Sequence, residues 1–448
     1  MKTFTLDQFG GKADGQFDNS EAFKKALTEL KEAGSGKLIV GKGKWSTGPI
    51  ELFSGTELHL EEGCEVSFIP EPKRYPPVFT RWEGVECWCM HPCVFSKDQN
   101  NVKVTGKGVF DGNGSVWWKM RESKRGQDKP VTEIEKKFAA MNPGFEDQPG
   151  GGGGREVQFL RPPLVQFLSC TDILLEDVTL RNSPFWTMHP VYVKGLVLKG
   201  ITVQNPHNAP NTDGIDIDSC EDVQVLGCTV SVGDDGIALK SGSGPDGIKI
   251  NRPCRNVLVR DCVVGDGHGG IVIGSETAAG VDHLVAENCT FNGTDRGIRI
   301  KTRRGRGGDI HNLVFRNLTM IDNLCPFAVN MYYKCGAKPE DEFFTLDKLP
   351  INDATPHIHD ITISGIKATG CKASAGFIVG LPERPIKNLT IKDSTFETNE
   401  SSNESPQESE MFYGLPPVEE KSFRIKFADN PKFENVTVKG PAEPFIYE

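Results

Sequence analysis

The sequence predicts an all-β protein, a single-domain right-handed parallel β-helix, and two observations carry this prediction. A short phrase recurs in which a polar pair, often ending in Asn or Asp, precedes an alternating apolar run, as in Asp172-Ile173-Leu174-Leu175. Its first apolar residue returns mostly about 23 to 34 residues later, within the range of repeat architectures. That residue stands at Ile173, Leu196, Val223, Val257, Leu284, Leu313, Ile361 and Leu389. The second observation is composition, since 49 Gly and 29 Pro supply the many turns of a solenoid.

Each phrase reads as a β-strand because its residues are apolar or β-branched with a period of two. Most phrases are followed by a second short strand, for example at 178–180 and 289–291. Two or three short strands per repeat are typical of a parallel β-helix. A propeller would need longer antiparallel blades, and a leucine-rich repeat would need a tighter Leu-dominated consensus with helices, so both fit less well.

We expect residues 1–448 to form one domain, because a solenoid grows by adding coils without starting a new core. About residues 1–45 are expected to cap its open end with an amphipathic helix over 21–30, which follows the capping residues Asp18-Asn19-Ser20 and ends at Gly34.

Three stretches read as loops because they mix charges, Gly and Pro without a strand pattern. They are about 113–160, about 338–354, which fills the long interval between Leu313 and Ile361, and the acidic stretch 397–410.

The charge of the chain excludes some classes of partner. A net charge of -10 and a pI near 5.5 argue against nucleic acid, and no stretch has the roughly 18 apolar residues of a membrane span. An acidic substrate requires a local concentration of cations, and the densest basic run comprises Lys301, Arg303, Arg304 and Arg306. The oligomeric state cannot be predicted.

We expect a cytoplasmic protein because no signal peptide is recognisable, although a secreted protein whose leader has been removed would look the same. The 13 cysteines are an odd number, and Cys228, Cys262 and Cys289 recur at matching positions after the phrase. This pattern predicts a ladder of buried, reduced thiols. The spacing of Cys87, Cys89 and Cys93 does not match a common zinc site, and we expect no metal and no cofactor.

Four motifs follow one another at intervals of roughly one coil. They are Asn-Thr-Asp-Gly (211–214), Asp-Asp (234–235), Gly-His-Gly (267–269) and Arg-Ile-Lys (299–301). Strands in adjacent coils lie about 4.8 Å apart, so the motifs are expected to stack Asp213, Asp234, Asp235 and His268 on one face. Carboxylates about 6.5 to 9.5 Å apart suit an inverting glycosidase, and crowding is expected to raise the pKa of at least one.

Arg299 and Lys301 flank Ile300 on one expected strand, so period two directs both cations to one face and Ile300 into the core. Outward cations there suit the carboxylates of an acidic polysaccharide. The simpler interpretation is that Asp-Gly pairs and His268 are turn residues and that the cations form a solvated face. Four motifs in register make this interpretation less favoured than a site.

The four motifs resemble those of the polygalacturonases, glycoside hydrolase family 28. The resemblance extends to 7–15, 185–190 and 272–276, so nearly the whole chain is involved. It implies a pectin-lyase-like β-helix and hydrolysis of α-1,4-galacturonosidic bonds in pectin-derived polygalacturonate, with inversion and without a metal.

The resemblance also implies roles for individual residues. Asp234 matches the general acid, Asp213 and Asp235 match the pair that activates water, and His268 matches the histidine that supports the acid and the sugar. The substrate-binding candidates are Asn211, Arg299, Lys301, Arg303 and Lys240.

One departure from the family is Gly236, which stands where members often have Cys, and it should alter packing more than chemistry. The run 297–308 and the long loop after Asn113 resemble bacterial exo-acting members, which implies release of galacturonic acid. The alternatives left open are a rhamnogalacturonan or substituted-galacturonan hydrolase, an endo-polygalacturonase, a pectate lyase and a non-catalytic carbohydrate-binding solenoid.

Overall fold

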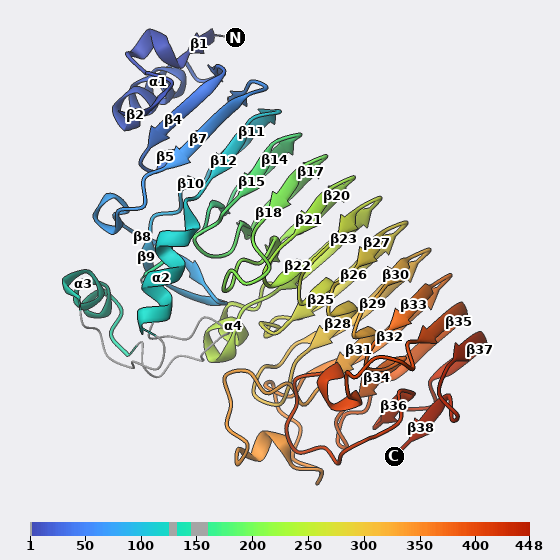
Figure 1. Ribbon diagram of the computed structural model, residues 1–448. Helices are drawn as coiled ribbons and strands as arrows, with labels where there is room; N and C mark the ends of the chain where they lie inside the picture. The colour runs from blue at the N-terminus through green and yellow to red at the C-terminus, as the bar shows by residue number, and fades with distance from the viewer. Residues whose placement is uncertain (1, 125–131, 145–159) are drawn as a thin grey trace. The chain divides into compact units, whose positions relative to one another are not determined.

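The computed structural model describes residues 2–124, 132–144 and 160–448. The chain divides into two compact units, of which the first runs to Gly233 and the second comprises Asp234–Glu448 together with Glu83–Val85. Each unit consists mainly of short parallel strands that stack on one another from coil to coil (Figure 1). The fold is a right-handed parallel β-helix, as the sequence predicts. The single domain stays a prediction.

Three stacks of parallel strands build the first unit. The first stack contains β1 (Lys2–Thr5), β3 (Gly36–Val40), β6 (Thr56–Leu60), β11 (Asn100–Gly106), β14 (Thr171–Glu176), β17 (Lys194–Lys199) and β20 (Glu221–Leu226). The second contains β2 (Asp14–Asp18), β4 (Gly43–Thr47), β7 (Cys64–Phe68), β12 (Val109–Asp111), β15 (Thr179–Arg181), β18 (Thr202–Gln204) and β21 (Thr229–Ser231). The third contains β5 (Ile50–Glu51), β10 (Val94–Lys97), β13 (Val165–Leu168), β16 (Met188–Val191) and β19 (Ile215–Asp218). A separate two-stranded sheet contains β8 (Pro77–Trp82) and β9 (Val85–Met90).

The second unit repeats this arrangement. Its first stack contains β23 (Cys254–Arg260), β26 (Val281–Glu287), β29 (Asp309–Arg316), β32 (His357–Ser364), β35 (Lys387–Thr398) and β37 (Lys432–Lys439). Its second contains β24 (Val263–Val264), β27 (Thr290–Asn292), β30 (Thr319–Ile321) and β33 (Lys367–Cys371), which pairs with the end of β35. Its third contains β22 (Asp235–Lys240), β25 (Gly269–Gly274), β28 (Arg296–Lys301), β31 (Cys325–Asn330), β34 (Gly376–Val379), β36 (Phe423–Lys426) and β38 (Phe445–Tyr447).

The repeat phrase marks the register of the coils. Ile173 pairs with Leu196 and Leu196 with Val223, all in the first unit. In the second unit the paired positions run in order through Val257, Leu284, Leu313, Ile361 and Leu389. These side chains are buried in the core of their unit.

The residue before each of these apolar positions bends the backbone. Asp172, Asp222, Asn256 and Asn312 have φ between 55° and 59°, in the left-handed region that Asn and Asp tolerate better than other side-chain-bearing residues. The turn therefore favours Asn or Asp at the end of the polar pair, although Gly195 and His283 adopt a positive φ at the same position in two other coils.

The amino-terminal helix α1 (Ser20–Glu32) forms where the sequence predicts it. It lies beside the first strands of its unit (Figure 1), and its side chains Phe23, Leu27 and Leu30 are buried. Asp18 Oδ1 accepts hydrogen bonds from the backbone N–H and hydroxyl of Ser20 at the start of the helix. The other α-helices among the described residues are α2 (Gly114–Lys124), α3 (Glu133–Met141) and α4 (Gly244–Ile250).

The expected loop at 113–160 contains two of these helices, which corrects the sequence-based prediction for 114–124 and 133–141. The hydroxyl of Thr132 accepts the backbone N–H of Glu135, and the Glu135 carboxylate accepts the backbone N–H of Thr132, so a capping box begins α3. Trp117 of α2 is fully buried and packs edge-on against Tyr75, with ring centroids 5.4 Å apart. Residues 125–131 and 145–159 of the expected loop lie outside the described residues.

The other two expected loops agree better with the structure. Between Asn330 and His357 there is no strand of the stacks, and the only helical segment is a 3₁₀ turn at Glu342–Phe344. The expected acidic loop at 397–410 begins two residues later than predicted, because β35 extends to Thr398.

All 13 cysteines are reduced, and twelve of them are buried. Cys262 and Cys289 directly precede the paired residues Val263 and Thr290 of adjacent coils, as a thiol ladder requires. Among the described residues, no helix has the length and apolar character that a membrane span requires.

Candidate active site

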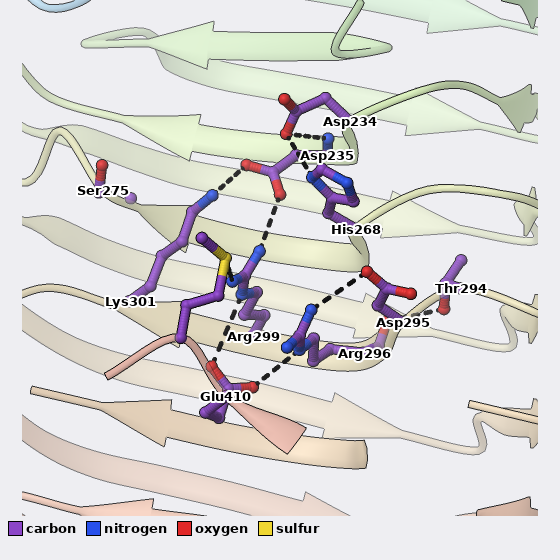
Figure 2. A network of polar contacts seen from close by, with 12 residues as sticks. Asp234, Asp235, His268, Ser275, Thr294, Asp295, Arg296, Arg299, Lys301 and Glu410 are labelled. Atoms are coloured by element: carbon purple, nitrogen blue, oxygen red, sulfur yellow. Dashed lines mark hydrogen bonds and ion pairs between the residues drawn. The ribbon is translucent and has the colours of Figure 1, made fainter. Parts of the chain in front are cut away.

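Three neighbouring strands of the second unit, with the residues next to their ends, carry most of the expected site residues. β22 lies beside β25, and β25 lies beside β28. Asp235 opens β22 and pairs in register with Gly269, and Val272 of β25 pairs with Arg299 of β28. The coil spacing therefore brings Asp234, Asp235, His268, Arg299 and Lys301 together, as Figure 2 shows.

Asp234 and His268 form a pair at the amino ends of their strands. The distance between His268 Nδ1 and Asp234 Oδ1 is 3.1 Å, and the backbone N–H of His268 donates to the carbonyl of Asp234 at 2.8 Å. The backbone N–H of Asp235 also donates to Asp234 Oδ1, at 3.0 Å. The imidazole is 42% exposed, so the pair lies at the surface of the site where a substrate can reach it.

Asp235 is buried between two cations. Lys301 Nζ lies 2.6 Å from Asp235 Oδ2, and Arg299 Nη1 lies 3.5 Å from Asp235 Oδ1 (Figure 2). Ile300 is fully buried in the core, which confirms that Arg299 and Lys301 share the opposite face. The carboxylate is therefore held in a fixed orientation by charge-assisted contacts.

Crowding is expected to raise the pKa of at least one of the three carboxyls, but it does not raise the pKa of Asp234. Burial by itself raises the pKa of Asp234, but the positive charges of His268, Lys301 and Lys240 outweigh burial and hold the pKa well below its usual range. In turn the Asp234 carboxylate raises the pKa of His268 against the effect of burial. The shared proton of the pair is therefore held on the imidazole.

Lys240, the last residue of β22, is buried beside a second carboxylate. Its ammonium donates to Glu276 Oε2 at 3.1 Å and to the carbonyl of Gly274 at 3.3 Å. Burial raises the pKa of Glu276, but Lys240 and Arg306 lower it to about 2. Lys240 thus acts on Asp234 through its charge while it binds Glu276.

Arg299 is oriented by Glu410 and Tyr333, two residues that the sequence analysis does not identify. Glu410 Oε2 lies 3.8 Å from Arg299 Nε, and Glu410 Oε1 accepts a hydrogen bond from Arg296 Nε at 3.0 Å. Tyr333 lies under both cations, with its ring centroid 5.5 Å from the Arg299 guanidinium carbon and 5.4 Å from Lys301 Nζ. Glu410 lies in the stretch that reads as a solvated acidic loop, so no local signal identifies it.

The arginines that follow β28 mainly make hydrogen bonds to other parts of the protein. Arg303, a predicted substrate-binding residue, donates to the carbonyls of Cys335 and Gly336. Arg304 makes two hydrogen bonds to the Glu383 carboxylate, at 2.6 and 2.8 Å. The hydrogen bonds of Arg303 anchor the segment between β31 and β32, and a substrate contact of Arg303 stays a prediction.

Close packing explains why position 236 is a glycine. A Cβ atom at this position would lie 2.7 Å from Val264 Cγ1 and 2.9 Å from the carbonyl oxygen of Gly269. No side chain fits there without displacement, so the departure from the family pattern is a packing feature beneath the Asp pair.

Asn211 and Asp213 belong to the first unit. The guanidinium of Arg161 donates to Asn211 Oδ1 at 2.9 Å and to the carbonyl of Pro210 at 2.7 Å, and it lies 4.8 Å from the ring centroid of Phe185. The carbonyl of Asp213 accepts the backbone N–H of Thr187 at 2.9 Å. These contacts fix the backbone of the first motif within its unit.

A family model described as glycosyl hydrolases family 28 matches residues 156–412. A probable polygalacturonase from Vitis vinifera is 28% identical over 401 residues, which cover 87% of this chain and 73% of that protein. An exo-poly-α-D-galacturonosidase from Dickeya chrysanthemi is 26% identical over 418 residues, which cover 88% of this chain and 63% of that protein.

The fold is similar to solved structures. A hyperthermoactive exopolygalacturonase from Thermotoga maritima superposes with a TM-score of 0.79 at 31% identity, covering 98% of this chain and 92% of that chain. A family 28 exopolygalacturonase from Yersinia enterocolitica has a TM-score of 0.75 at 20% identity, covering 100% of this chain and 77% of that chain, and shows the same fold.

Proposed function

The chain belongs to glycoside hydrolase family 28, and from this premise we propose that it hydrolyses α-1,4-galacturonosidic bonds of polygalacturonate and its oligomers from chain ends, releasing galacturonic acid. One observation carries the proposal. Two cations on one strand, Arg299 and Lys301, flank a buried carboxylate beside an Asp–His pair. Cations suit a substrate that bears a carboxylate on every sugar, while a neutral polysaccharide would have no use for them. The relatives named as exo-acting enzymes support the chain-end specificity.

The proposed mechanism inverts the anomeric configuration. Asp234 donates a proton to the glycosidic oxygen as its bond to the anomeric carbon breaks, and a water molecule attacks that carbon from the opposite side. Asp235, with Asp213 by resemblance to the family motif, accepts the proton that the water loses. Asn211 is assigned to substrate binding on the same grounds, and Lys240 stays a candidate for substrate binding.

His268 supplies the proton that Asp234 passes on. Because Asp234 lies beside three cationic groups, its carboxyl does not hold a proton by itself at neutral pH. We propose that a galacturonate carboxylate near Lys301 partly neutralises that charge and so raises the pKa of Asp234. The imidazolium then transfers its proton through Asp234 to the leaving oxygen, and His268 ends the step neutral.

The proposed function is tested by a time course on polygalacturonate and defined oligogalacturonides with a chelator present. Products are separated by size, and ultraviolet absorbance reports unsaturated ends. Galacturonic acid alone from the first minutes supports exo-hydrolysis. Mixed oligomers would instead indicate an endo-enzyme, unsaturated ends a lyase, and no cleavage a rhamnogalacturonan or substituted-galacturonan hydrolase.

We also propose that the protein works in a reducing compartment. The support is that none of the 13 cysteines forms a disulfide and that twelve are buried. Thiol titration of the denatured protein, purified without reductant, is expected to give thirteen thiols per chain. A lower count would contradict this assignment.

A further inference from the structure

We propose that the outer face of the second unit binds one first-row divalent transition-metal ion through Asp309, His357 and His359. One ligand atom from each of these residues lies within 4.8 Å of the others. The site lies on the first strand stack, whereas the candidate catalytic residues come from the third, so the family chemistry does not use it.

The strand register places the three ligands together. Asp309 opens β29 and pairs with His357, which opens β32 in the next coil. The next pair, Ile310 and Ile358, is fully buried, so period two turns Asp309, His357 and also His359 outward.

The two carboxylates that face the ring nitrogens of His359 favour a bound metal ion. Its Nε2 lies 3.0 Å from Asp309 Oδ1, and its Nδ1 lies 2.7 Å from Asp360 Oδ2. A neutral imidazole has one N–H and cannot donate to both carboxylates. His359 is therefore either an imidazolium or a ligand whose second nitrogen binds something other than a proton. The His357 ring packs against it at a tilt of 36°, with ring centroids 4.2 Å apart, and its own Nδ1 lies 2.9 Å from Asp309 Oδ1.

The partners of the imidazoles match the outer layer of known metal centres, in which a ligating histidine donates its other N–H to a carboxylate. Asp360 holds Nδ1 of His359 and leaves Nε2 for the ion. A third imidazole, His311, repeats the pattern, with Nε2 3.2 Å from Asp282 Oδ1. Among the described residues its Nδ1 has no hydrogen-bond partner, and it lies 3.8 Å from Asp309 Oδ2, at the edge of the proposed site.

The ligand types and their access indicate the class of metal. Imidazole nitrogens with a carboxylate suit Zn²⁺ and its neighbours, whereas Ca²⁺ and Mg²⁺ prefer oxygen ligands only. Asp309 and His357 line a surface hollow of about 600 Å³, so an ion can enter from solvent. A bound ion would fix the first residue of β32, where the segment after β31 ends, to the preceding coil.

The test uses the full-length protein after treatment with a chelator and dialysis. Titration calorimetry with Zn²⁺ is expected to show one ion bound per chain, and Zn²⁺ is expected to raise the melting temperature. His359→Gln and Asp309→Asn should each weaken binding at least about tenfold. Both side chains are partly exposed, and circular dichroism checks that the variants remain folded. Mg²⁺ and Ca²⁺ at the same concentration should not bind.

Two controls separate this site from other groups. His283→Asn removes a nearby imidazole that contacts Asp282, and Asn also tolerates the φ of 57° at this position, so binding should be retained. Asp234→Asn alters the candidate active site and should likewise retain binding. No binding near one equivalent, or binding unaffected by His359→Gln and Asp309→Asn, would overturn the proposal and leave a protonated His–Asp cluster.

Discussion

At the scale of single residues, the position of one proton decides how the candidate active site works. The pKa of Asp234 is lowered and that of His268 is raised, because each ion stabilises the other across 3.1 Å. The pair therefore resembles a coupled acid whose proton belongs to both groups. A substrate carboxylate that neutralises Lys301 would shift this proton toward Asp234.

Replacing Asp234 with Asn tests its role as the acid. We expect kcat to fall by about 10²- to 10⁴-fold, the usual contribution of general acid catalysis, with a smaller change in KM. Steady-state kinetics on oligogalacturonides measure both values. Asp266→Asn is the matched control, because this exposed carboxylate lies two residues before His268 and its loss should leave kcat unchanged. A wild-type kcat in Asp234→Asn would remove this residue from the mechanism.

The protonation of His268 predicts how the stability of the fold and kcat/KM depend on pH. Its pKa is raised above the usual value of about 6.5, so the ion pair with Asp234 stabilises the fold fully below about pH 6.5. This stabilisation is lost as pH rises through the folded pKa, and the alkaline limb of kcat/KM should fall in the same range. NMR of the ring protons should show the pKa of His268 decreasing in Asp234→Asn. An unchanged pKa would show that the carboxylate does not control the imidazole.

Glu410 is expected to act on substrate binding by orienting Arg299. Glu410→Gln weakens a charge-assisted contact, and we expect KM to rise by about tenfold while kcat changes less. Glu404→Gln, an exposed change in the same loop, should leave both values unchanged. A fall in kcat alone would assign Glu410 to the chemical step instead.

Local patterns identify only part of the candidate site. The order Arg299, Ile300, Lys301 predicts that the two cations share one face of the strand, because successive side chains of a strand point to opposite faces. Glu410 and Tyr333 reach the same cations from distant segments, and such contacts leave no periodic signal. The low pKa of Asp234 is equally unpredictable, since it depends on charges brought in from three strands.

At the scale of secondary-structure elements, the strands are well predicted and two helices are not. The apolar positions from Ile173 to Leu389 mark strands because the core imposes the same alternation on each coil. The helix α3 was missed although Thr132 and Glu135 have the spacing of a capping box. Its surroundings mix charges and Gly, so a short helical signal is hidden in a polar stretch.

The segment between β31 and β32 is expected to depend on Arg304. Its guanidinium makes two hydrogen bonds to Glu383 and further bonds to the carbonyls of Phe343, Thr345 and Asp347. Arg304→Met leaves a buried carboxylate without its partner, and we expect a loss of about 3 kcal/mol in the free energy of unfolding. Urea denaturation measures this loss. Lys348→Met, an exposed change in the same segment, should have little effect.

At the scale of the whole molecule, the number of cooperative units remains to be measured. Stacked coils stabilise one another through nearest-neighbour contacts, and we expect a continuous array to unfold together. Differential scanning calorimetry should therefore show one transition. Two separate transitions would contradict the single-domain prediction and would match the two compact units.

The left-handed residue that opens each repeat also bears on how such a protein can evolve. Asn312 and Asp360 adopt nearly the same φ, 55° in both, although the connection after β31 is far longer than the others. The bend restores the strand register whatever length of chain precedes it, so Leu313 still pairs with Ile361. Loop length can therefore vary by insertion or deletion while the strand stacks are inherited unchanged. Exchange of this segment between relatives would then leave the strand stacks in place.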